Sequence, residues 1–251
     1  GNHLERVRTV HLAGPDPQKT HVSNDIRPTG DKDTLFPLQA AVGYSIAQTL
    51  FIGKRSVIVE GITDYWLLKA IDSTPPTEGE SRLHEDTVLI PAGGTSKLMP
   101  LASIMFGTAG VGGQQMLVIL DSDTEGLQAA TRVQRDLFSG DDSRVLMLGN
   151  AIELEKATIE DLIPRDDYVR ALVASGYDVA LNADEAKAAT TISAVEQAFL
   201  RLKLGKFGAE HKSAAALRLI DAWARDPAAI PSLTRAKASL LFSAVNSRFA
   251  K

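Results

Sequence analysis

The chain has 251 residues, of which 44% are hydrophobic and 23% are charged, so it is long enough for one large globular domain or two smaller ones. No run of about 18 apolar residues occurs and cysteine is absent, which argues against a membrane-spanning helix, a disulfide framework or a thiolate zinc site and favours a cytoplasmic location without membrane contact. The net charge of −4 argues against a protein that only coats DNA, but it is compatible with an enzyme that acts on nucleic acid through an acidic metal site.

The first part of the chain is polar and then becomes helical in pattern. Residues 1–33 contain several prolines and glycines, which predicts an extended or irregular arm. Apolar side chains at helical spacing predict a helix over Phe36–Phe51. The short β-branched run Ser56–Val59 predicts a buried strand, and the helical period over Thr63–Ile71 completes a strand–turn–helix unit.

The middle of the chain repeats this alternation. A polar loop is predicted over residues 73–86. Further strands are predicted over Thr87–Pro91, Gln115–Leu120 and Arg144–Leu148, with helices over Ser96–Phe106 and Leu127–Leu137. Strands that alternate with helices favour βαβ crossovers, and therefore an α/β fold with a mainly parallel, Rossmann-like sheet flanked by helices.

The last part of the chain shows no strand pattern from about residue 158 onward. Alanine-rich segments over 186–202, 212–225 and 234–249 predict helices. These helices form either an additional helical subdomain or extra cover for the sheet.

Acidic residues follow two of the predicted strands at the point where each strand ends. Glu60 follows the first strand and Asp64 comes one helical turn later. Asp121 and Asp123 follow the strand that ends at Leu120. In an open α/β sheet functional groups gather where strands end, so we expect these carboxylates to face one cleft.

Converging carboxylates indicate a site for a hard divalent cation. They repel one another unless a cation neutralises them, and Mg²⁺ takes oxygen ligands while it retains waters for a substrate phosphate. Two such ions can activate water and stabilise the leaving oxygen in phosphodiester cleavage. An Asp-x-Asp pair alone is also compatible with a helix cap, but two acidic motifs, each at a strand end, favour the functional interpretation.

The two acidic motifs also match a known family by their order and spacing. One is a strand that ends in Glu60 and Gly61 with Asp64 following, and the other is Asp-x-Asp-x-Glu-Gly over residues 121–126. Together they resemble the Toprim domain of topoisomerases, bacterial primases, recombination-repair proteins and OLD (overcoming lysogenization defect) nucleases. Three segments most resemble the OLD family: 49–55, 59–65 and 157–164. The resemblance covers roughly residues 34–165 and, loosely, the helical remainder.

This resemblance implies a DNA endonuclease that uses Mg²⁺, with two ions in the site and with Mn²⁺ or Ca²⁺ as substitutes. OLD proteins carry an N-terminal ABC-type ATPase ahead of the Toprim region, and no Gly-x-x-x-x-Gly-Lys-Ser/Thr motif occurs in this chain. We therefore expect residues 1–50 to form the junction to the ATPase, 51–165 the Toprim core, and 166–251 a helical subdomain. The implied context is a homodimer that cuts DNA in phage defence or DNA repair.

The resemblance also assigns roles to individual acidic residues. Those expected to bind metal and to take part in catalysis are Glu60, Asp64, Asp121 and Asp123. Glu125 is a further metal ligand or a helix cap. Glu160 or Asp161 supplies a ligand to a second metal, or only a favourable charge at a helix N-terminus. Ser122 is a candidate for binding a phosphate or a metal-bound water.

A basic residue is needed to stabilise charge on the transferring phosphate, and OLD proteins place one after the sheet. Lys206 and Lys212 flank a glycine-containing break between predicted helices and are both catalytic candidates, with ordinary solvated lysines as the alternative. The loop of Gly93 and Gly94, with Lys97, is either a phosphate-binding turn or a plain tight turn.

Other classes fit the sequence less well. The alternatives are a non-catalytic module that binds Mg²⁺ and DNA, and a Toprim fragment of a topoisomerase-like or primase-like protein. A type IA topoisomerase needs a nucleophilic tyrosine on a separate large domain, and a primase usually brings a cysteine-rich zinc module, which a chain without cysteine cannot form. A receiver-type phospho-acceptor domain fits the paired acidic motifs poorly.

Overall fold

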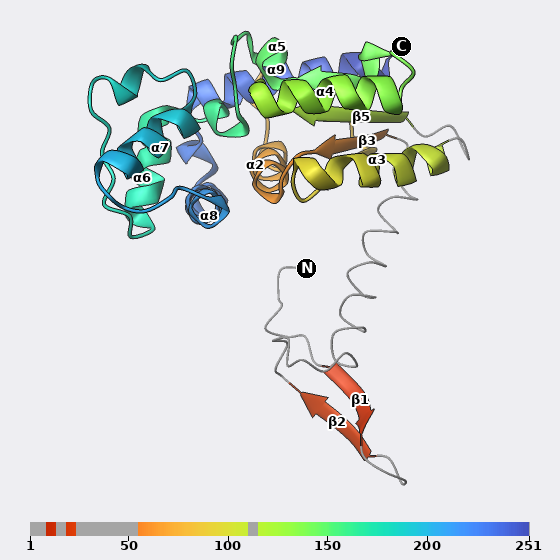
Figure 1. Cartoon of the computed structure of the whole chain (residues 1–251), viewed down its shortest axis with the longest axis horizontal. Coiled ribbons are helices and arrows are strands. Elements are labelled where there is room, and N and C mark those ends of the chain that lie inside the picture. The colour runs from red at the N-terminus through yellow and green to blue at the C-terminus, as the bar shows by residue number, and fades with distance from the viewer. Residues whose placement is uncertain (1–8, 14–18, 24–54, 110–114, 251) are drawn as a thin grey trace. The chain divides into compact units, whose positions relative to one another are not determined.

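The computed structural model describes residues 9–13, 19–23, 55–109 and 115–250, and the chain divides into two compact units, Gly1–Ile52 and Gly53–Lys251 (Figure 1). In the first unit, strand β1 (Thr9–Ala13) pairs antiparallel with β2 (Lys19–Ser23). The predicted arm therefore contains a strand pair. The helix predicted over 36–51 lies outside the described residues.

The second unit is built on a sheet of four parallel strands in the order β4-β3-β5-β6. Their bounds are β3 (Arg55–Val59), β4 (Thr87–Pro91), β5 (Gln115–Leu120) and β6 (Val145–Met147). Each lies within one residue of the predicted strand at either end, because short β-branched and apolar runs bounded by polar residues carry a strong signal. The predicted α/β fold with a parallel sheet is confirmed.

Three helices connect these strands: α2 (Ile62–Asp72), α3 (Thr95–Ala109) and α4 (Thr124–Asp136). From β3 the chain passes through α2 to β4 at one edge, whereas from β5 it passes through α4 to β6 at the other edge. The neighbouring strands β3 and β5 thus send their connections in opposite directions. Such a switch point leaves a crevice at the carboxyl ends of the two strands, where ligands bind in open α/β sheets.

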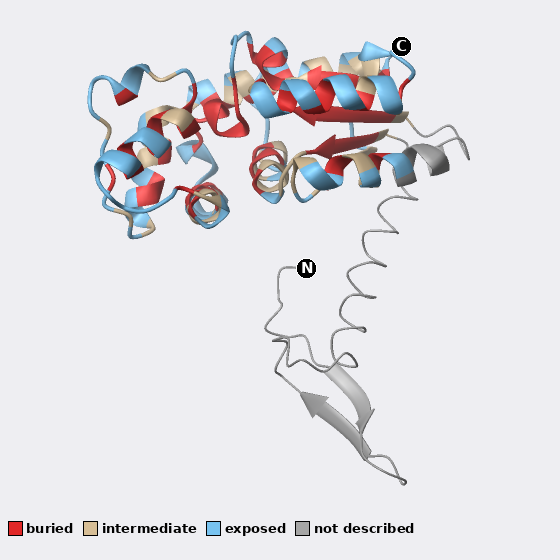
Figure 2. Cartoon of the chain, viewed as in Figure 1, coloured by how far each residue is buried: buried red, intermediate tan, exposed pale blue. Residues whose placement is uncertain are grey.

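The sheet is covered on both faces, and its strands are buried and mainly apolar beyond their first residues (Figure 2). Val57, Val59, Leu117 and Ile119 share one core with apolar side chains of α2 and of the C-terminal helix. The alternate strand residues point to the opposite face, and α3 and α4 contact β5. Burial of each such side chain stabilises the fold by about 1.5–3 kcal/mol.

Five further helices follow: α5 (Leu148–Ile152), α6 (Arg165–Ala174), α7 (Thr191–Arg201), α8 (Ala209–Arg225) and α9 (Ser232–Phe249). Short 3-10 turns lie between them at Asp142–Arg144, Ile159–Leu162, Glu185–Lys187 and Pro227–Ala229. Helices α6, α7 and α8 are grouped beyond one end of the strands (Figure 1). Helix α8 packs on α2 as well as on α6, and α9 returns to α5, α2 and β5.

These helices share one hydrophobic core with the sheet and lie in the same compact unit, so residues 166–251 do not stand apart from it. The predicted helices agree with α7, α8 and α9 to within a few residues. Helix α6 was not predicted, although Tyr168, Ala171 and Leu172 have helical spacing and are buried. None of the described helices is long and apolar enough to cross a membrane.

Candidate functional site

A cavity of about 470 Å³ opens at the carboxyl ends of β3 and β5, at the switch point of the sheet. Its walls come from the turn after β3, the start of α2, the loop after β4, the end of β5, and helices α7 and α8. The charged residues that line it are Glu60, Asp64, Asp121, Glu196 and Lys212. Four of these five carry the acidic or basic groups that the sequence predicts for the site.

Glu60 is the first residue after β3 and is held by the loop after β4. The hydroxyl of Thr95 donates a hydrogen bond of 2.6 Å to Glu60 Oε1, and the amide of Gly94 donates to the Glu60 carbonyl over 2.9 Å. Glu60 Oε2 is buried without a hydrogen-bond partner. Burial raises the pKa of Glu60, as do the neighbouring carboxylates of Asp64 and Asp123, so this group is poised to accept a cation.

Asp64 lies in the first turn of α2 and caps that helix. Its Oδ2 accepts a hydrogen bond of 2.9 Å from the amide of Gly61, and its Oδ1 accepts one of 3.3 Å from the Thr63 hydroxyl. Burial and the nearby Glu160 raise the pKa of Asp64. The cap fixes the carboxylate at the cavity wall, because an acceptor for the first helical amides is needed at that point.

Asp121 directly follows β5 and lies among the other charged groups of the cluster. Burial raises the pKa of Asp121 well above its usual range, and the negative charges of Asp64 and Glu160 raise it further. Helix α4 starts tightly against it, since a Cβ on Gly126 would lie 2.0 Å from the carbonyl oxygen of Asp121. Only glycine at position 126 allows this approach.

Glu160 and Lys212 bring opposite charges to the same place from the 3-10 turn Ile159–Leu162 and from α8. Glu160 is 1% exposed, and Lys212 Nζ lies 3.4 Å from Glu160 Oε1, which makes an ion pair. The pair lacks good hydrogen-bond geometry, so both carboxylate oxygens of Glu160 remain without a hydrogen-bond partner. Burial would lower the pKa of Lys212, but Glu160, Asp121 and Asp64 together raise it. Lys212 is therefore protonated and brings a positive charge into the carboxylate cluster.

The charged residues of the site fall into two groups, which are linked because Glu60 raises the pKa of Asp121. We call Asp64, Asp121, Glu160 and Lys212 the inner group, because each shifts the pKa of another member. The outer group consists of Glu60, Asp123 and Glu125, and the last two raise the pKa of Glu60. Asp123 also caps α4, with Oδ1 accepting from the Gly126 amide over 2.7 Å. Glu125 is exposed in the first turn of the same helix.

Two predicted site residues form structural hydrogen bonds instead. Asp161 is buried, and its carboxylate accepts from the amides of Thr158 and Thr191 over 2.8 and 2.7 Å. Ser122 is also buried, and its hydroxyl accepts from the Gly149 amide over 2.7 Å. The structure thus separates Glu160, which faces the cluster, from Asp161, which joins the turn to α7.

The structure also separates the two candidate lysines. Lys212 lines the cavity, whereas Lys206 is exposed and does not line it. Gly93 and Gly94 lie at the cavity wall with φ values of 82° and 111°, which glycine adopts without strain. Lys97 is exposed in the first turn of α3, outside the cavity lining.

Two polar residues at the site were missed in the sequence. Thr95 holds Glu60 by its hydroxyl, and its position directly after two glycines at a strand-to-helix turn was an available signal. Glu196 lines the cavity from α7 and carries no local motif that marks it. Its position depends on how α7 packs, which a single sequence does not reveal.

The chemistry of this donor set fits a hard divalent cation. Among the residues described, no group of three or more Asp, Glu or His side chains is arranged to hold a metal ion as it stands. Buried oxygens of Glu60 and Glu160 nevertheless lack partners. The pKa values of Asp64 and Asp121 are raised first by burial and then by repulsion from neighbouring carboxylates, which a cation would relieve.

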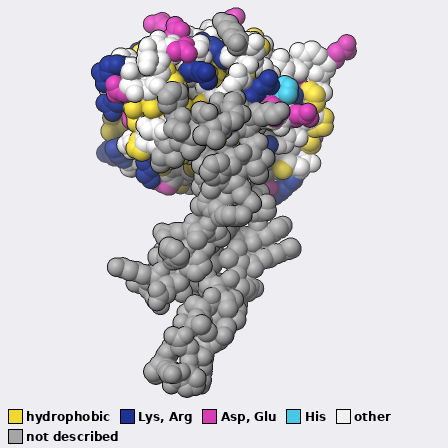
Figure 3. All heavy atoms as spheres, turned by 90° about the vertical axis from the view of Figure 1, so that its right-hand side faces the viewer, with side chains coloured by type: hydrophobic (Ala, Val, Ile, Leu, Met, Phe, Trp, Pro, Cys, Tyr) yellow, Lys and Arg dark blue, Asp and Glu magenta, His cyan; other side chains and the backbone are white. Residues whose placement is uncertain are grey.

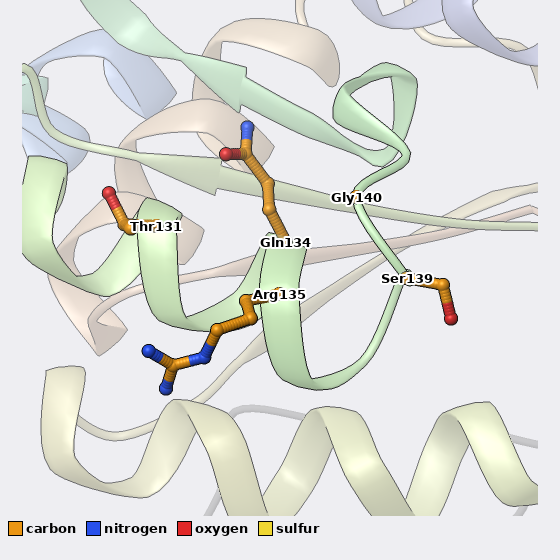
Figure 4. Close-up of a pocket in the computed structure, with 5 residues that line it drawn as sticks. All are labelled: Thr131, Gln134, Arg135, Ser139 and Gly140. Carbon is orange, nitrogen blue, oxygen red and sulfur yellow. The ribbon is translucent and has the colours of Figure 1, made fainter.

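A second hollow and the charged surface of the described residues are weaker candidates for a functional site. A hollow of about 560 Å³ beside α4 is lined by Thr131, Gln134, Arg135, Ser139 and Gly140 (Figure 4). It contains no carboxylate, and Arg135 is already paired with the exposed Asp136. On the face in Figure 3, Lys and Arg side chains lie beside Asp and Glu side chains, so both signs of charge are present there. The smaller acidic cavity is therefore the better candidate.

No known protein family, curated protein or solved structure matches the chain. The residues of the cavity and the resemblance in the two acidic motifs are therefore the basis for a functional proposal.

Proposed function

We propose that residues 53–251 form a divalent-metal-dependent DNA nuclease of the Toprim type, most similar to the nuclease region of OLD proteins. The observation that carries this proposal is the meeting of Glu60, Asp64, Asp121 and Glu160 with Lys212 at the switch point of a parallel sheet. A cluster of buried and half-buried carboxylates beside one half-buried lysine suits an anionic substrate that is bound together with divalent cations.

Each charged residue has a task in this proposal. Glu60 and Asp121 would hold the cation. The other carboxylates of the inner group, Asp64 and Glu160, and of the outer group, Asp123 and Glu125, would add negative charge around it. The bound Mg²⁺ would supply Lewis-acid activation of water and of the phosphate oxygens. The carboxylates would also orient the attacking water by accepting its hydrogen bonds.

Lys212 would stabilise the charge that develops on the phosphate. Its ammonium group lies 3.4 Å from Glu160 in the free protein, and a cation that takes over Glu160 would release it toward the substrate. Gly93 and Gly94 leave room for a phosphate at the opposite wall. The resemblance extends the proposal to an ABC-type ATPase as partner and to a cytoplasmic homodimer.

The experiment is cleavage of supercoiled plasmid in Mg²⁺, Mn²⁺, Ca²⁺ or EDTA. We expect metal-dependent nicking or linearisation by the wild type, and a loss of at least about 100-fold in Asp121→Asn. Glu155→Gln, an exposed acidic residue outside the cavity lining, should cleave like the wild type. A folded wild type that cleaves with none of these metals would refute the nuclease proposal for this chain.

A second candidate is a non-catalytic module that binds Mg²⁺ and DNA. The observation in its favour is that Lys212 already neutralises part of Glu160 without a metal. It predicts metal-dependent retention of DNA in a gel-shift assay without cleavage, so the same plasmid reactions separate the two candidates.

A further inference from the structure

Helix α8 begins with a cap formed by a histidine. The amide of Gly208 donates a hydrogen bond of 3.0 Å to Nδ1 of His211, and the amide of His211 donates back to the Gly208 carbonyl over 3.1 Å. The bond from the Gly208 amide to His211 is one half of a capping box, with an imidazole where Glu or Gln is usual, and the Gly208 carbonyl takes the place of the N-cap side chain. The cap ties the first turn of α8 to the loop before it.

The imidazole is fixed by its surroundings. His211 is 8% exposed, and its ring centroid lies 4.7 Å from that of Tyr177, 4.9 Å from that of Phe199 and 5.3 Å from that of Phe207. The carboxylate of Glu210 lies 3.3 Å from the same Nδ1, but its side chain is 70% exposed and solvated. We therefore assign the Nδ1 lone pair to the amide of Gly208, which needs an acceptor at the helix start.

The next residue along the helix is Lys212. Its amide donates to the same Gly208 carbonyl over 3.2 Å, so one glycine anchors both residues. Its ammonium group lies 3.4 Å from Glu160. Helix α2 uses the same device, because the amide of Gly61 donates to Asp64 at the third helical position. Helices α2 and α8, which deliver Asp64 and Lys212 to the cavity, therefore both start on a glycine held by a side chain.

We propose that His211 is a positioning residue, which fixes the start of α8 through Gly208 and thereby holds the ammonium group of Lys212 against Glu160. The inference rests on the proposed function, which gives Lys212 its task at the phosphate. His211 itself touches no substrate in this account, and it acts only through the backbone of the first turn.

The test uses two substitutions that both fill the space between the aromatic rings. His211→Gln keeps an oxygen that can accept from the Gly208 amide, whereas His211→Leu does not. Asp226→Ala is the matched control, because Asp226 Oδ1 accepts from the Ala228 amide over 3.0 Å at the other end of α8. That end lies 14 residues after Lys212, which is about 21 Å at about 1.5 Å per residue.

The first measurement is an NMR spectrum of the lysine ammonium groups in the metal-free protein, with Lys212 assigned by Lys212→Ala. The ammonium group of Lys212 is ion-paired with Glu160 and its side chain is only partly exposed, so its exchange with water is slowed and it should give a resolved signal. We expect this signal to vanish in His211→Leu and to remain in His211→Gln and Asp226→Ala. Its persistence in a folded His211→Leu protein would overturn the inference, and this result does not depend on cleavage.

The second measurement is a double-mutant cycle on plasmid nicking. His211→Leu should lower kcat about tenfold with little change in KM, His211→Gln should recover most of it, and His211→Leu should cost nothing further in a Lys212→Ala background. Fully additive losses would overturn the inference. If the wild type cleaves no DNA, the proposed function fails, and the NMR measurement alone decides the role of His211.

Discussion

At the scale of single residues, the partly buried negative charges of the site destabilise the folded protein. Burial and the neighbouring Asp64 and Glu160 raise the pKa of Asp121 well above its ordinary value of 3.8. A group whose pKa is raised by folding binds protons more tightly in the folded state. Its contribution to stability is therefore largest at low pH, and it is lost as the pH rises from the ordinary value through the raised one.

The raised pKa of Asp121 has a consequence for the stability of Asp121→Asn in the metal-free protein. At pH 8 in EDTA, the variant should be more stable than the wild type by on the order of 1–3 kcal/mol, because it removes a carboxylate that repels its neighbours. The difference should shrink as the pH falls toward the raised pKa of Asp121, since the wild-type carboxylate then takes up a proton. Urea unfolding at several pH values measures this difference. A difference that stays constant with pH would show that Asp121 does not titrate in this range.

The two lysines give a matched pair at the same scale. Lys212→Ala should lower the rate of DNA cleavage by about 10²–10³-fold, the usual loss for one group that stabilises transition-state charge. Lys206→Ala should change the rate by less than about threefold, because Lys206 is exposed outside the cavity lining. Single-turnover cleavage of an end-labelled duplex compares the two, and equal losses would contradict the placement of Lys212.

At the scale of elements, the site depends on how closely α4 approaches the end of β5. Gly126 in the first turn of α4 packs on the carbonyl of Asp121, and Gly149 in α5 packs on Ser122. These contacts fix the segment 121–123 between two helix starts. Backbone precision at this point therefore comes from glycines that lie outside the cavity lining.

Gly126→Ala tests this packing. Its Cβ would lie 2.0 Å from the Asp121 carbonyl oxygen, so we expect a loss of more than about 2 kcal/mol in the free energy of unfolding. Gly61→Ala is the control, because its Cβ would meet nothing closer than 3.4 Å and should cost less than about 1 kcal/mol. Thermal or urea unfolding in EDTA distinguishes the two. Similar costs would mean that α4 can shift away from β5.

At the scale of the whole molecule, the sheet could be predicted from the sequence because each strand is a short apolar run with polar ends. Glu60 and Asp121 could be placed together for the same reason, since parallel strands end at one edge. Lys212 could not be told from Lys206, nor Glu160 from Asp161, because each choice depends on where α8 starts and how the turn Ile159–Leu162 faces the core. Tertiary packing decides such choices, and local pattern does not.

The measurement that tests the central claim most directly is anomalous scattering from crystals of this chain grown or soaked in Mn²⁺. The account predicts a Mn²⁺ peak in the cavity, within coordination distance of carboxylate oxygens of Glu60 and Asp121, and no such peak in Asp121→Asn. Data from well-ordered crystals with no Mn²⁺ in the cavity, or with Mn²⁺ bound only elsewhere, would contradict the account.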